Sequence, residues 1–92
     1  MKSKTTYASV WDALEDDPIK VENLKMRSEL MIAINNKIAK DKLNQSDAAK
    51  CLAISQPRVS ALSQGKIDAF RLDTLVNFAH RLGLHVSINI AA

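Results

Sequence analysis

The sequence predicts a mostly α-helical domain of about five helices that ends in one short β-strand. Apolar residues recur at helical spacing along most of the 92-residue chain. There are only two glycines and two prolines, too few for the many turns of an all-β fold. In the C-terminal stretch HVSINI, apolar and polar residues alternate, which is the pattern of a strand.

The composition limits the size and setting of this domain. Apolar residues make up 47% of the chain, which is enough for one core, and 92 residues are too few for two domains. The single cysteine, Cys51, cannot form an intrachain disulfide and fits a reduced compartment. No apolar run approaches the roughly 18 residues of a membrane span, and the basic start lacks the apolar stretch of a signal peptide. We therefore expect a cytoplasmic protein with no membrane partner.

Two helices are predicted in the first half of the chain. The first is short, has Ser9 as its N-cap, and carries an apolar stripe. Asp17 caps the second helix and Pro18 occupies its first turn. We expect this long helix to run from Ile19 to about Lys42, before a boundary near Leu43–Asn44. The stripe of the first helix consists of Tyr7, Val10, Trp11 and Leu14, and that of the second of Leu24, Met31, Ile34 and Ile38.

Two short helices joined by a tight turn are predicted next. Asn44 caps the first of them, which spans about Gln45–Leu52, and Ala53–Ile54 form the turn. Ser55 caps the second, which runs to about Gln64 and ends at Gly65.

The remainder of the chain is predicted to hold a loop, a helix and the strand. Residues 67–70 read as a loop, and the following helix ends at Gly83. A single strand leaves its backbone groups unpaired, so we expect it to pair with the same strand of a second copy about a two-fold axis. A loosely ordered terminus is the alternative. The residues of that dimer interface are Val86, Ile88 and Ile90.

The stretch QSDAAKCLAISQPRVSALSQGK resembles the helix-turn-helix of XRE-type proteins, the family of lambdoid repressors and Cro. Gln45 opens the first helix as in the family, Ala49 occupies the close crossing of the two helices, and Gly65–Lys66 match the residues that close the second. A turn residue that is usually glycine is Ala53 here, and Arg71 stands where a capping serine is more common. We expect the turn at Ala53 to be slightly reshaped.

The resemblance implies a lambda-repressor-like bundle and a division of the chain. Residues 1–17 would form an N-terminal extension, residues 18–84 the XRE-type domain with its helix-turn-helix at about 45–64, and residues 85–92 a dimerisation strand. VWDALEDDP, ENLKMRSELMIAI and LGLHVSINI extend the resemblance to bacterial antitoxins of the HigA kind, which are often encoded beside a ribosome-dependent RNase toxin. The implied function is a sequence-specific transcriptional repressor, the antitoxin of a type II pair, that is nucleoid-associated when bound to its operator.

In such a fold, side chains near the start of the second short helix reach base edges in the major groove. Gln56 can make a bidentate contact to adenine and Arg58 to guanine, whereas Ala61 offers only a methyl group to thymine. Phosphates are expected at the flanks, where helix N-termini and polar or basic side chains lie. The predicted base contacts are Ser55, Gln56, Pro57, Arg58 and Ala61; the predicted phosphate contacts are Asn44, Gln45, Ser60, Gln64 and Lys66. A homodimer would present two such surfaces to a palindromic operator.

Charge divides the chain into two parts. Residues 7–30 hold six acids and three bases, whereas residues 37–81 hold eight bases and four acids. These charges either merely solvate the surface, or the basic part faces a polyanion and the acidic part does not. The acidic segment with Tyr7, Val10, Trp11 and Leu14 can either pack against the long helix of its own chain or bind a basic partner such as an RNase toxin.

The sequence disfavours an enzyme but leaves two other function classes open. The two histidines, the one cysteine and the scattered acids show no spacing of a catalytic triad or a metal site, so we expect no enzyme, no cofactor and no metal. The remaining alternatives to an antitoxin are a stand-alone or prophage XRE regulator without a toxin, and an interaction module that acts mainly by binding a basic partner.

Overall fold

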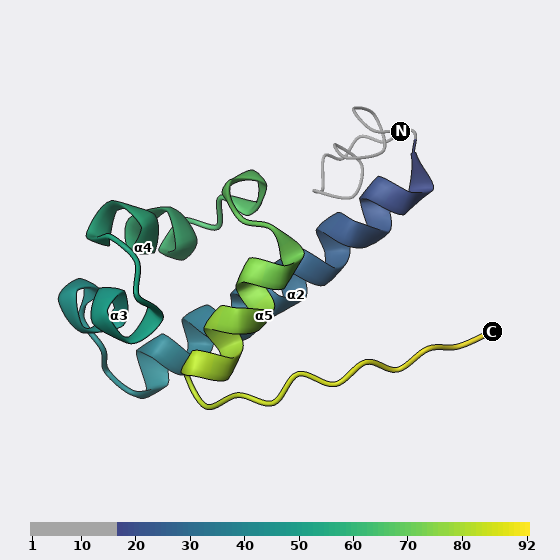
Figure 1. Cartoon of the computed structure of the whole chain (residues 1–92). Helices are drawn as coiled ribbons and strands as arrows, with labels where there is room; N and C mark the ends of the chain where they lie inside the picture. The colour runs from purple at the N-terminus through teal and green to yellow at the C-terminus, as the bar shows by residue number, and fades with distance from the viewer. Residues whose placement is uncertain (1–16) are drawn as a thin grey trace.

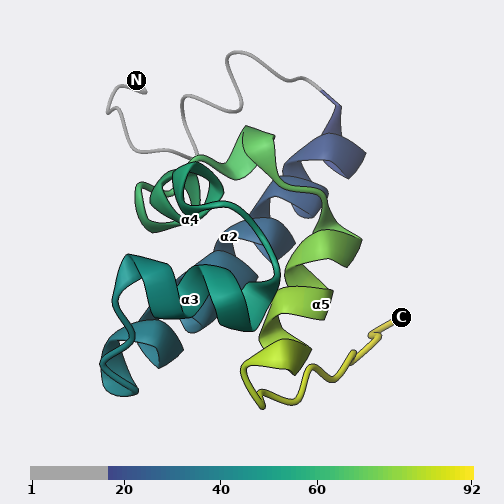
Figure 2. The same cartoon turned by 60° about the vertical axis from the view of Figure 1, so that its left-hand side comes forward.

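The computed structural model describes residues 17–92, which form a bundle of four α-helices and one 3₁₀ turn. The helices are α2 (Pro18–Lys40), α3 (Gln45–Leu52), α4 (Gln56–Ser63) and α5 (Leu72–Arg81), and η2 (Ile67–Ala69) is the 3₁₀ turn. The first predicted helix, with its N-cap Ser9, lies outside the described residues. α5 packs along α2, and α3 packs against α4 near the C-terminal part of α2 (Figures 1 and 2).

The N-terminal caps form as the sequence predicts. Asp17 Oδ1 accepts a hydrogen bond from the backbone N–H of Ile19, and Asn44 Oδ1 accepts one from that of Asp47. Ser55 Oγ accepts one from the N–H of Arg58. Arg71, which replaces the more common serine, makes no side-chain cap for α5. Three of the four helices therefore start on a side-chain hydrogen bond that satisfies an otherwise unpaired N–H.

The C-terminal ends share one hydrogen-bond pattern, in which the residue after a left-handed residue donates to the carbonyl five positions earlier. Leu43 donates to Ile38 O, Ile54 to Ala49 O, Lys66 to Ala61 O and Leu84 to Ala79 O. The left-handed residues are Lys42, Ala53, Gly65 and Gly83.

This pattern corrects two expectations. The long helix ends at Lys40 rather than at about Lys42, because Lys42 itself adopts the left-handed conformation with φ 57°. The turn at Ala53 is not reshaped, because the alanine takes the left-handed conformation with φ 59° and ψ 45°.

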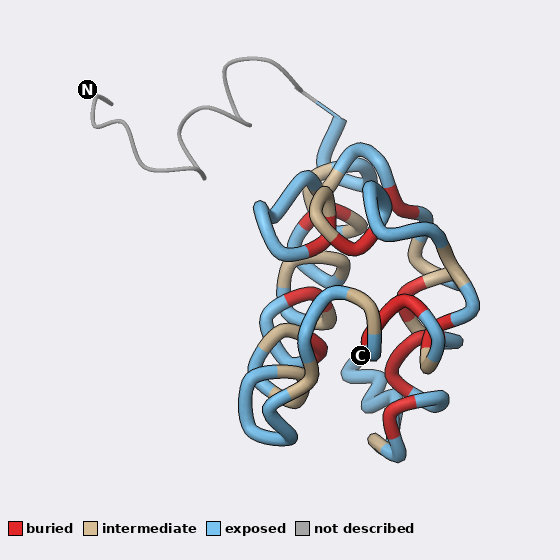
Figure 3. Tube along the Cα trace, turned by 90° about the vertical axis from the view of Figure 1, so that its left-hand side faces the viewer, coloured by how far each residue is buried: buried red, intermediate tan, exposed pale blue. Residues whose placement is uncertain are grey.

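The core is aliphatic with two phenylalanines at its centre. One cluster joins Met31 and Ile34 of α2 to residues of α3, α4 and α5, and a smaller one joins Ala48, Ala49 and Val59 at the crossing of α3 and α4. Phe70 is 1% exposed, and its ring meets that of Phe78 edge to face at 5.9 Å. Figure 3 marks the buried positions along the Cα trace, and each of the four described helices carries some of them. The stripe predicted on the long helix is largely confirmed, since Leu24, Met31 and Ile34 are buried and Ile38 is half-buried.

The predicted loop at residues 67–70 contains the 3₁₀ turn η2, and the predicted strand does not form in the single chain. Residues 84–92 have neither helix nor strand and extend away from the end of α5 (Figure 1). A strand needs hydrogen-bond partners for its backbone, and no other described segment offers them. Within residues 17–92, none of the helices combines the length and the hydropathy that a membrane span requires.

Candidate DNA-binding surface

The position of α4 follows from the small residues at its crossing with α3. Ala48 is fully buried and Ala49 is 8% exposed, and both pack against Val59 of α4. A larger side chain at either alanine would separate the two helices. Asn35 of α2 adds a hydrogen bond between α2 and α4, since its Nδ2 donates to Leu62 O at 3.0 Å. α4 is therefore held by contacts to both α2 and α3 and presents its other side to solvent.

The first turn of α4 is exposed to solvent. Val59 and Leu62 are buried against the bundle, at 4% and 0% exposure. Four of the five predicted base-contacting residues are exposed, whereas Ala61 is half-buried and packs against the core. The exposed four, Ser55, Gln56, Pro57 and Arg58, are consecutive.

Arg58 is engaged within the protein itself. Its Nη1 donates to Ala69 O at 3.0 Å, and its guanidinium carbon lies 4.3 Å from the centroid of the Phe70 ring. This distance is that of a cation–π contact. The side chain of Gln56, by contrast, makes no hydrogen bond to any residue within 17–92. The two side chains predicted to read bases therefore differ in their freedom to move.

The segment that Arg58 contacts is also held by a second arginine, which belongs to α2. Arg27 of α2 donates from Nη1 to Ile67 O at 3.3 Å and to Phe70 O at 3.2 Å, and from Nε to Asn23 Oδ1 at 2.7 Å. Three carbonyls of residues 67–70 thus accept hydrogen bonds from two guanidinium groups. Sequence reasoning missed Arg27 and Phe70, because no local spacing indicates contacts across about 40 residues.

The predicted phosphate contacts fall into two groups on the described surface. Asn44 and Gln45 are exposed at the N-terminus of α3, where Asn44 also serves as the cap. At the other end of α4, Ser60 is half-buried, and its Oγ accepts a hydrogen bond from Gln64 Nε2 at 3.1 Å. Lys66 is exposed and forms no ion pair with any residue from 17 to 92.

The remaining predicted site residues lie away from α4. Val86, Ile88 and Ile90 are exposed on the C-terminal tail, the two isoleucines at 84% and 87%. Tyr7, Val10, Trp11 and Leu14 lie outside the described residues. No group of three or more His, Cys, Asp or Glu side chains in the described part could hold a metal ion.

The two packed short helices, the small residues between them and the exposed first turn of the second define the chain as a helix-turn-helix protein. Comparison with known proteins supports this assignment to the helix-turn-helix class. A family model described as "Helix-turn-helix domain" matches residues 13–91, so the chain belongs to this family. A solved structure described as "Putative XRE Family Transcriptional Regulator" is similar, with 33% identity over 79% of this chain and 82% of that chain and a TM-score of 0.75. At this identity and coverage the chain belongs to the XRE family. The curated proteins contain no match.

Proposed function

We propose that this XRE-family protein is a sequence-specific DNA-binding transcriptional repressor whose helix α4 enters the major groove. The observation that carries the proposal is the consecutive exposure of residues 55–58 on a helix whose opposite face, at Val59 and Leu62, is buried. A recognition helix contacts base edges through its N-terminal residues, and these are the residues that the fold leaves open. Membership of the XRE family supports the same assignment.

Gln56 and Arg58 are the proposed readers of adenine and guanine, and Ser55, Pro57 and Ala61 complete the contacted surface. Gln56 is free to make its contact. Arg58 already donates from Nη1 to Ala69 O and lays its guanidinium over Phe70, so its side chain is less free to adjust to a guanine. One bidentate pair supplies roughly 1–3 kcal/mol of discrimination, and we expect the pair made by Gln56 to contribute more than the pair made by Arg58.

Phosphate contacts from Asn44, Gln45, Ser60, Gln64 and Lys66 would fix the position of α4 on the duplex. Few of these side chains are basic, so one protomer neutralises few phosphates and should bind weakly. A homodimer doubles that number and places two recognition helices about 34 Å apart on a palindromic operator. The exposed Val86, Ile88 and Ile90 are the proposed dimer contacts.

An antitoxin role is the finer form of this proposal. It rests on the sequence resemblance to HigA-like antitoxins and on the acidic segment that carries Tyr7, Val10, Trp11 and Leu14, which suits a basic RNase toxin. A neighbouring gene for a small basic protein, and a stable complex of the two purified products, would support it. A stand-alone XRE regulator would lack both.

Selection of bound sequences from random DNA tests the proposed function. Wild type should enrich one palindrome, Gln56→Ala should lose preference at one base pair of each half-site, and Arg58→Ala at another. Arg81→Ala removes an exposed arginine of α5 outside the proposed surface and serves as the matched control. If wild type enriches no sequence, or if both α4 variants enrich the wild-type palindrome unchanged, α4 does not read DNA.

A further inference from the structure

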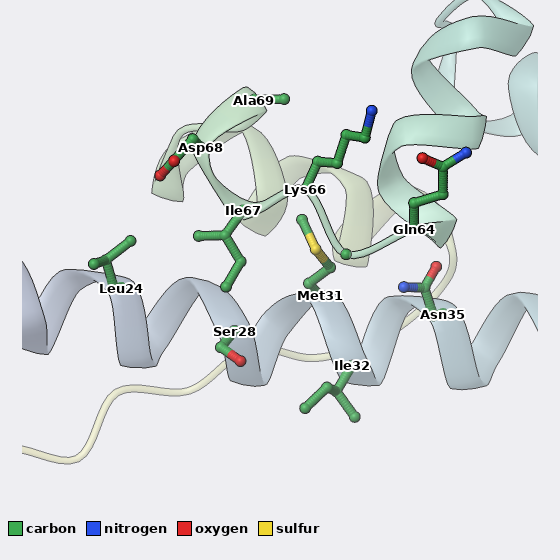
Figure 4. A pocket seen from close by; sticks show the side chains of 11 residues that line it. Leu24, Ser28, Met31, Ile32, Asn35, Gln64, Lys66, Ile67, Asp68 and Ala69 are labelled. Atoms are coloured by element: carbon green, nitrogen blue, oxygen red, sulfur yellow. The ribbon is translucent and has the colours of Figure 1, made fainter. Parts of the chain in front are cut away.

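The segment that connects α4 to α5 buries few of its own side chains. Its turn η2 contains no buried residue, and the preceding Lys66 makes no side-chain capping hydrogen bond. A groove of about 780 Å³ lies between α2 and residues 64–69, and Ile67 points toward α2 across it (Figure 4). Among residues 64–70, Ile67 is half-buried and only Phe70 is buried, at 1% exposure. The position of η2 therefore depends on Phe70 and on hydrogen bonds from other elements.

Arg27 of α2 supplies two of these hydrogen bonds. Its Nη1 donates to Ile67 O at 3.3 Å and to Phe70 O at 3.2 Å, the carbonyls of the first residue of η2 and of the residue that follows the turn. Its Nε donates to Asn23 Oδ1, one turn earlier on α2, at 2.7 Å. The guanidinium of Arg27 thus fixes both ends of η2 relative to α2.

Both intramolecular contacts of the Arg58 guanidinium are made to the segment that Arg27 holds. Its Nη1 donates to Ala69 O at 3.0 Å, and its carbon lies 4.3 Å from the centroid of the Phe70 ring. We propose that Arg27 is a positioning residue for Arg58 and thereby determines how strictly α4 selects the base that Arg58 reads. This inference rests on the proposed function, in which Arg58 reads a guanine.

The physical reason is that a guanidinium fixed in one place selects a base more strictly than a mobile one. A guanidinium carries several N–H donors, so Arg58 keeps donors for a base while one remains on Ala69 O. Held over Phe70, these donors pair with a guanine only where its O6 and N7 are in register with them. A released Arg58 would also reach phosphates, and phosphate contacts carry no sequence information. Loss of Arg27 should therefore lower the preference for guanine.

A direct phosphate contact by Arg27 is a different role and has different consequences. Arg27 is half-buried, and its Nη1 and Nε already donate within the protein. A phosphate contact raises the affinity for every sequence and adds to the salt dependence of binding. A positioning residue changes the preference at one base pair, so the two roles can be separated by measurement.

NMR of the free protein tests the coupling between the two arginines without DNA. The ring current of an aromatic face shifts a nearby N–H upfield, so the Arg58 Nε–H resonance should lie upfield of that of the exposed Arg81. Arg27→Met keeps an apolar stem on α2 without donors and should move the Arg58 resonance toward the value of Arg81. Lys25→Met removes a positive charge from an exposed position of α2 and should leave the resonance unchanged. An unshifted Arg58 resonance in wild type, or no movement in Arg27→Met, would overturn the proposal.

Competition binding then measures the base preference of the full chain. The probes are the palindrome that wild type selects from random DNA and two versions of it, each with one base pair of both half-sites replaced. Arg58→Ala identifies the base pair read by Arg58, and Gln56→Ala the one read by Gln56. A bidentate pair discriminates by about 5- to 150-fold, and Arg27→Met should lower the preference at the Arg58 base pair at least about threefold. The preference at the Gln56 base pair and the salt dependence should stay at their wild-type values, and Lys25→Met should preserve both preferences.

Two further variants test the route from Arg27 to the base. Arg27→Met combined with Arg58→Ala should lose no more preference at the Arg58 base pair than Arg58→Ala alone, because Arg27 acts through Arg58. Asn23→Ala removes the partner of Arg27 Nε and should give the same selective loss to a smaller extent. Circular dichroism confirms that each variant is folded, and Asn23→Ala decides the question if Arg27→Met does not fold.

The outcomes separate a failure of this inference from a failure of the proposed function. Wild-type preference at the Arg58 base pair in the folded variants, equal loss at both base pairs, or an equal loss of affinity for all sequences would overturn the role of Arg27. The proposed function would then stand on the effects of Arg58→Ala and Gln56→Ala. If neither of those two variants alters the preference, the proposed function fails and the inference fails with it.

Discussion

The helix-turn-helix unit and the C-terminal tail carry equally clear sequence patterns, but only the first becomes regular structure in the single chain. In the unit, α3 and α4 bury Ala48, Ala49 and Val59 against each other, and caps and turns satisfy the helix ends. In the tail, residues 84–92 form no helix or strand, and Ile88 and Ile90 are more than four-fifths exposed.

The two regions differ in where the backbone hydrogen-bond partners of a helix and of a strand lie. A helix makes its hydrogen bonds within its own segment and needs only an apolar surface beside it. A strand needs the backbone of another strand. The alternating pattern of the tail therefore predicts a strand that the single chain does not complete, and the proposed dimer would supply the missing backbone partner.

Shortening a buried side chain of α4 should have the largest effect on the free energy of unfolding. Leu62 is fully buried, so Leu62→Ala should lower the free energy of unfolding by about 2–5 kcal/mol through lost burial and a cavity. Ile88→Ala in the tail should change it by less than about 0.5 kcal/mol. Urea denaturation at one fixed protein concentration measures both, since self-association would otherwise add to apparent stability. A comparable loss in both variants would mean that the tail is part of the folded core.

Charging the tail should weaken the proposed dimer and leave the fold of the single chain intact. Each isoleucine buried at an interface contributes roughly 1.5–3 kcal/mol, so Ile88→Asp with Ile90→Asp should raise the dimer dissociation constant by at least about tenfold. Sedimentation velocity over a dilution series measures this, with Met26→Asp as a control at another exposed apolar residue. An unchanged dissociation constant in the tail variant would remove the tail from the interface.

Removal of the Arg58 side chain should have a smaller effect. It should lower the free energy of unfolding and also change which DNA sequence is bound. Arg58→Ala loses a hydrogen bond to Ala69 O and a cation–π contact with Phe70, together about 1–2 kcal/mol of unfolding free energy. Arg81→Ala should lose less than about 0.5 kcal/mol. If Arg58→Ala alters the selected DNA sequence but leaves urea stability unchanged, the guanidinium is not held on Phe70 in solution.

Most of the fold could be predicted because its signals are local. The caps Asp17, Asn44 and Ser55 and the ends at Gly65 and Gly83 depend only on neighbours in sequence, and all five form. Contacts between residues that are distant in the sequence could not be predicted. Arg58 reaches Ala69 eleven residues away and Arg27 reaches Phe70 forty-three away, and these pairs exist only once α2, α4 and η2 are assembled.

The same limit applies to the candidate site. Exposure of residues 55–58 follows from the helical period, since Val59 and Leu62 occupy the inner face. Whether an exposed arginine is free or already bound is decided by tertiary contacts, as the difference between Gln56 and Arg58 shows. The groove between α2 and residues 64–69 was also beyond prediction, because the residues on its two walls are about 30 to 45 positions apart in the sequence.

The smallest predicted effect concerns the turn between α3 and α4, where an alanine adopts the left-handed conformation that usually belongs to glycine. Ala53 has φ 59°, a conformation that costs an L-residue roughly 1–2 kcal/mol and costs glycine almost nothing. Ala53→Gly should therefore stabilise the protein by about 0.5–1 kcal/mol, after the larger entropy of glycine in the unfolded chain is subtracted. The same substitution at Ala33, which is exposed within α2, should destabilise it by about 1 kcal/mol. Opposite signs for the two variants in urea denaturation would show that the strain is local to the turn. A loss of stability at both positions would mean that Ala53 is relaxed, and the turn between α3 and α4 would then be as free of strain as the helices it joins.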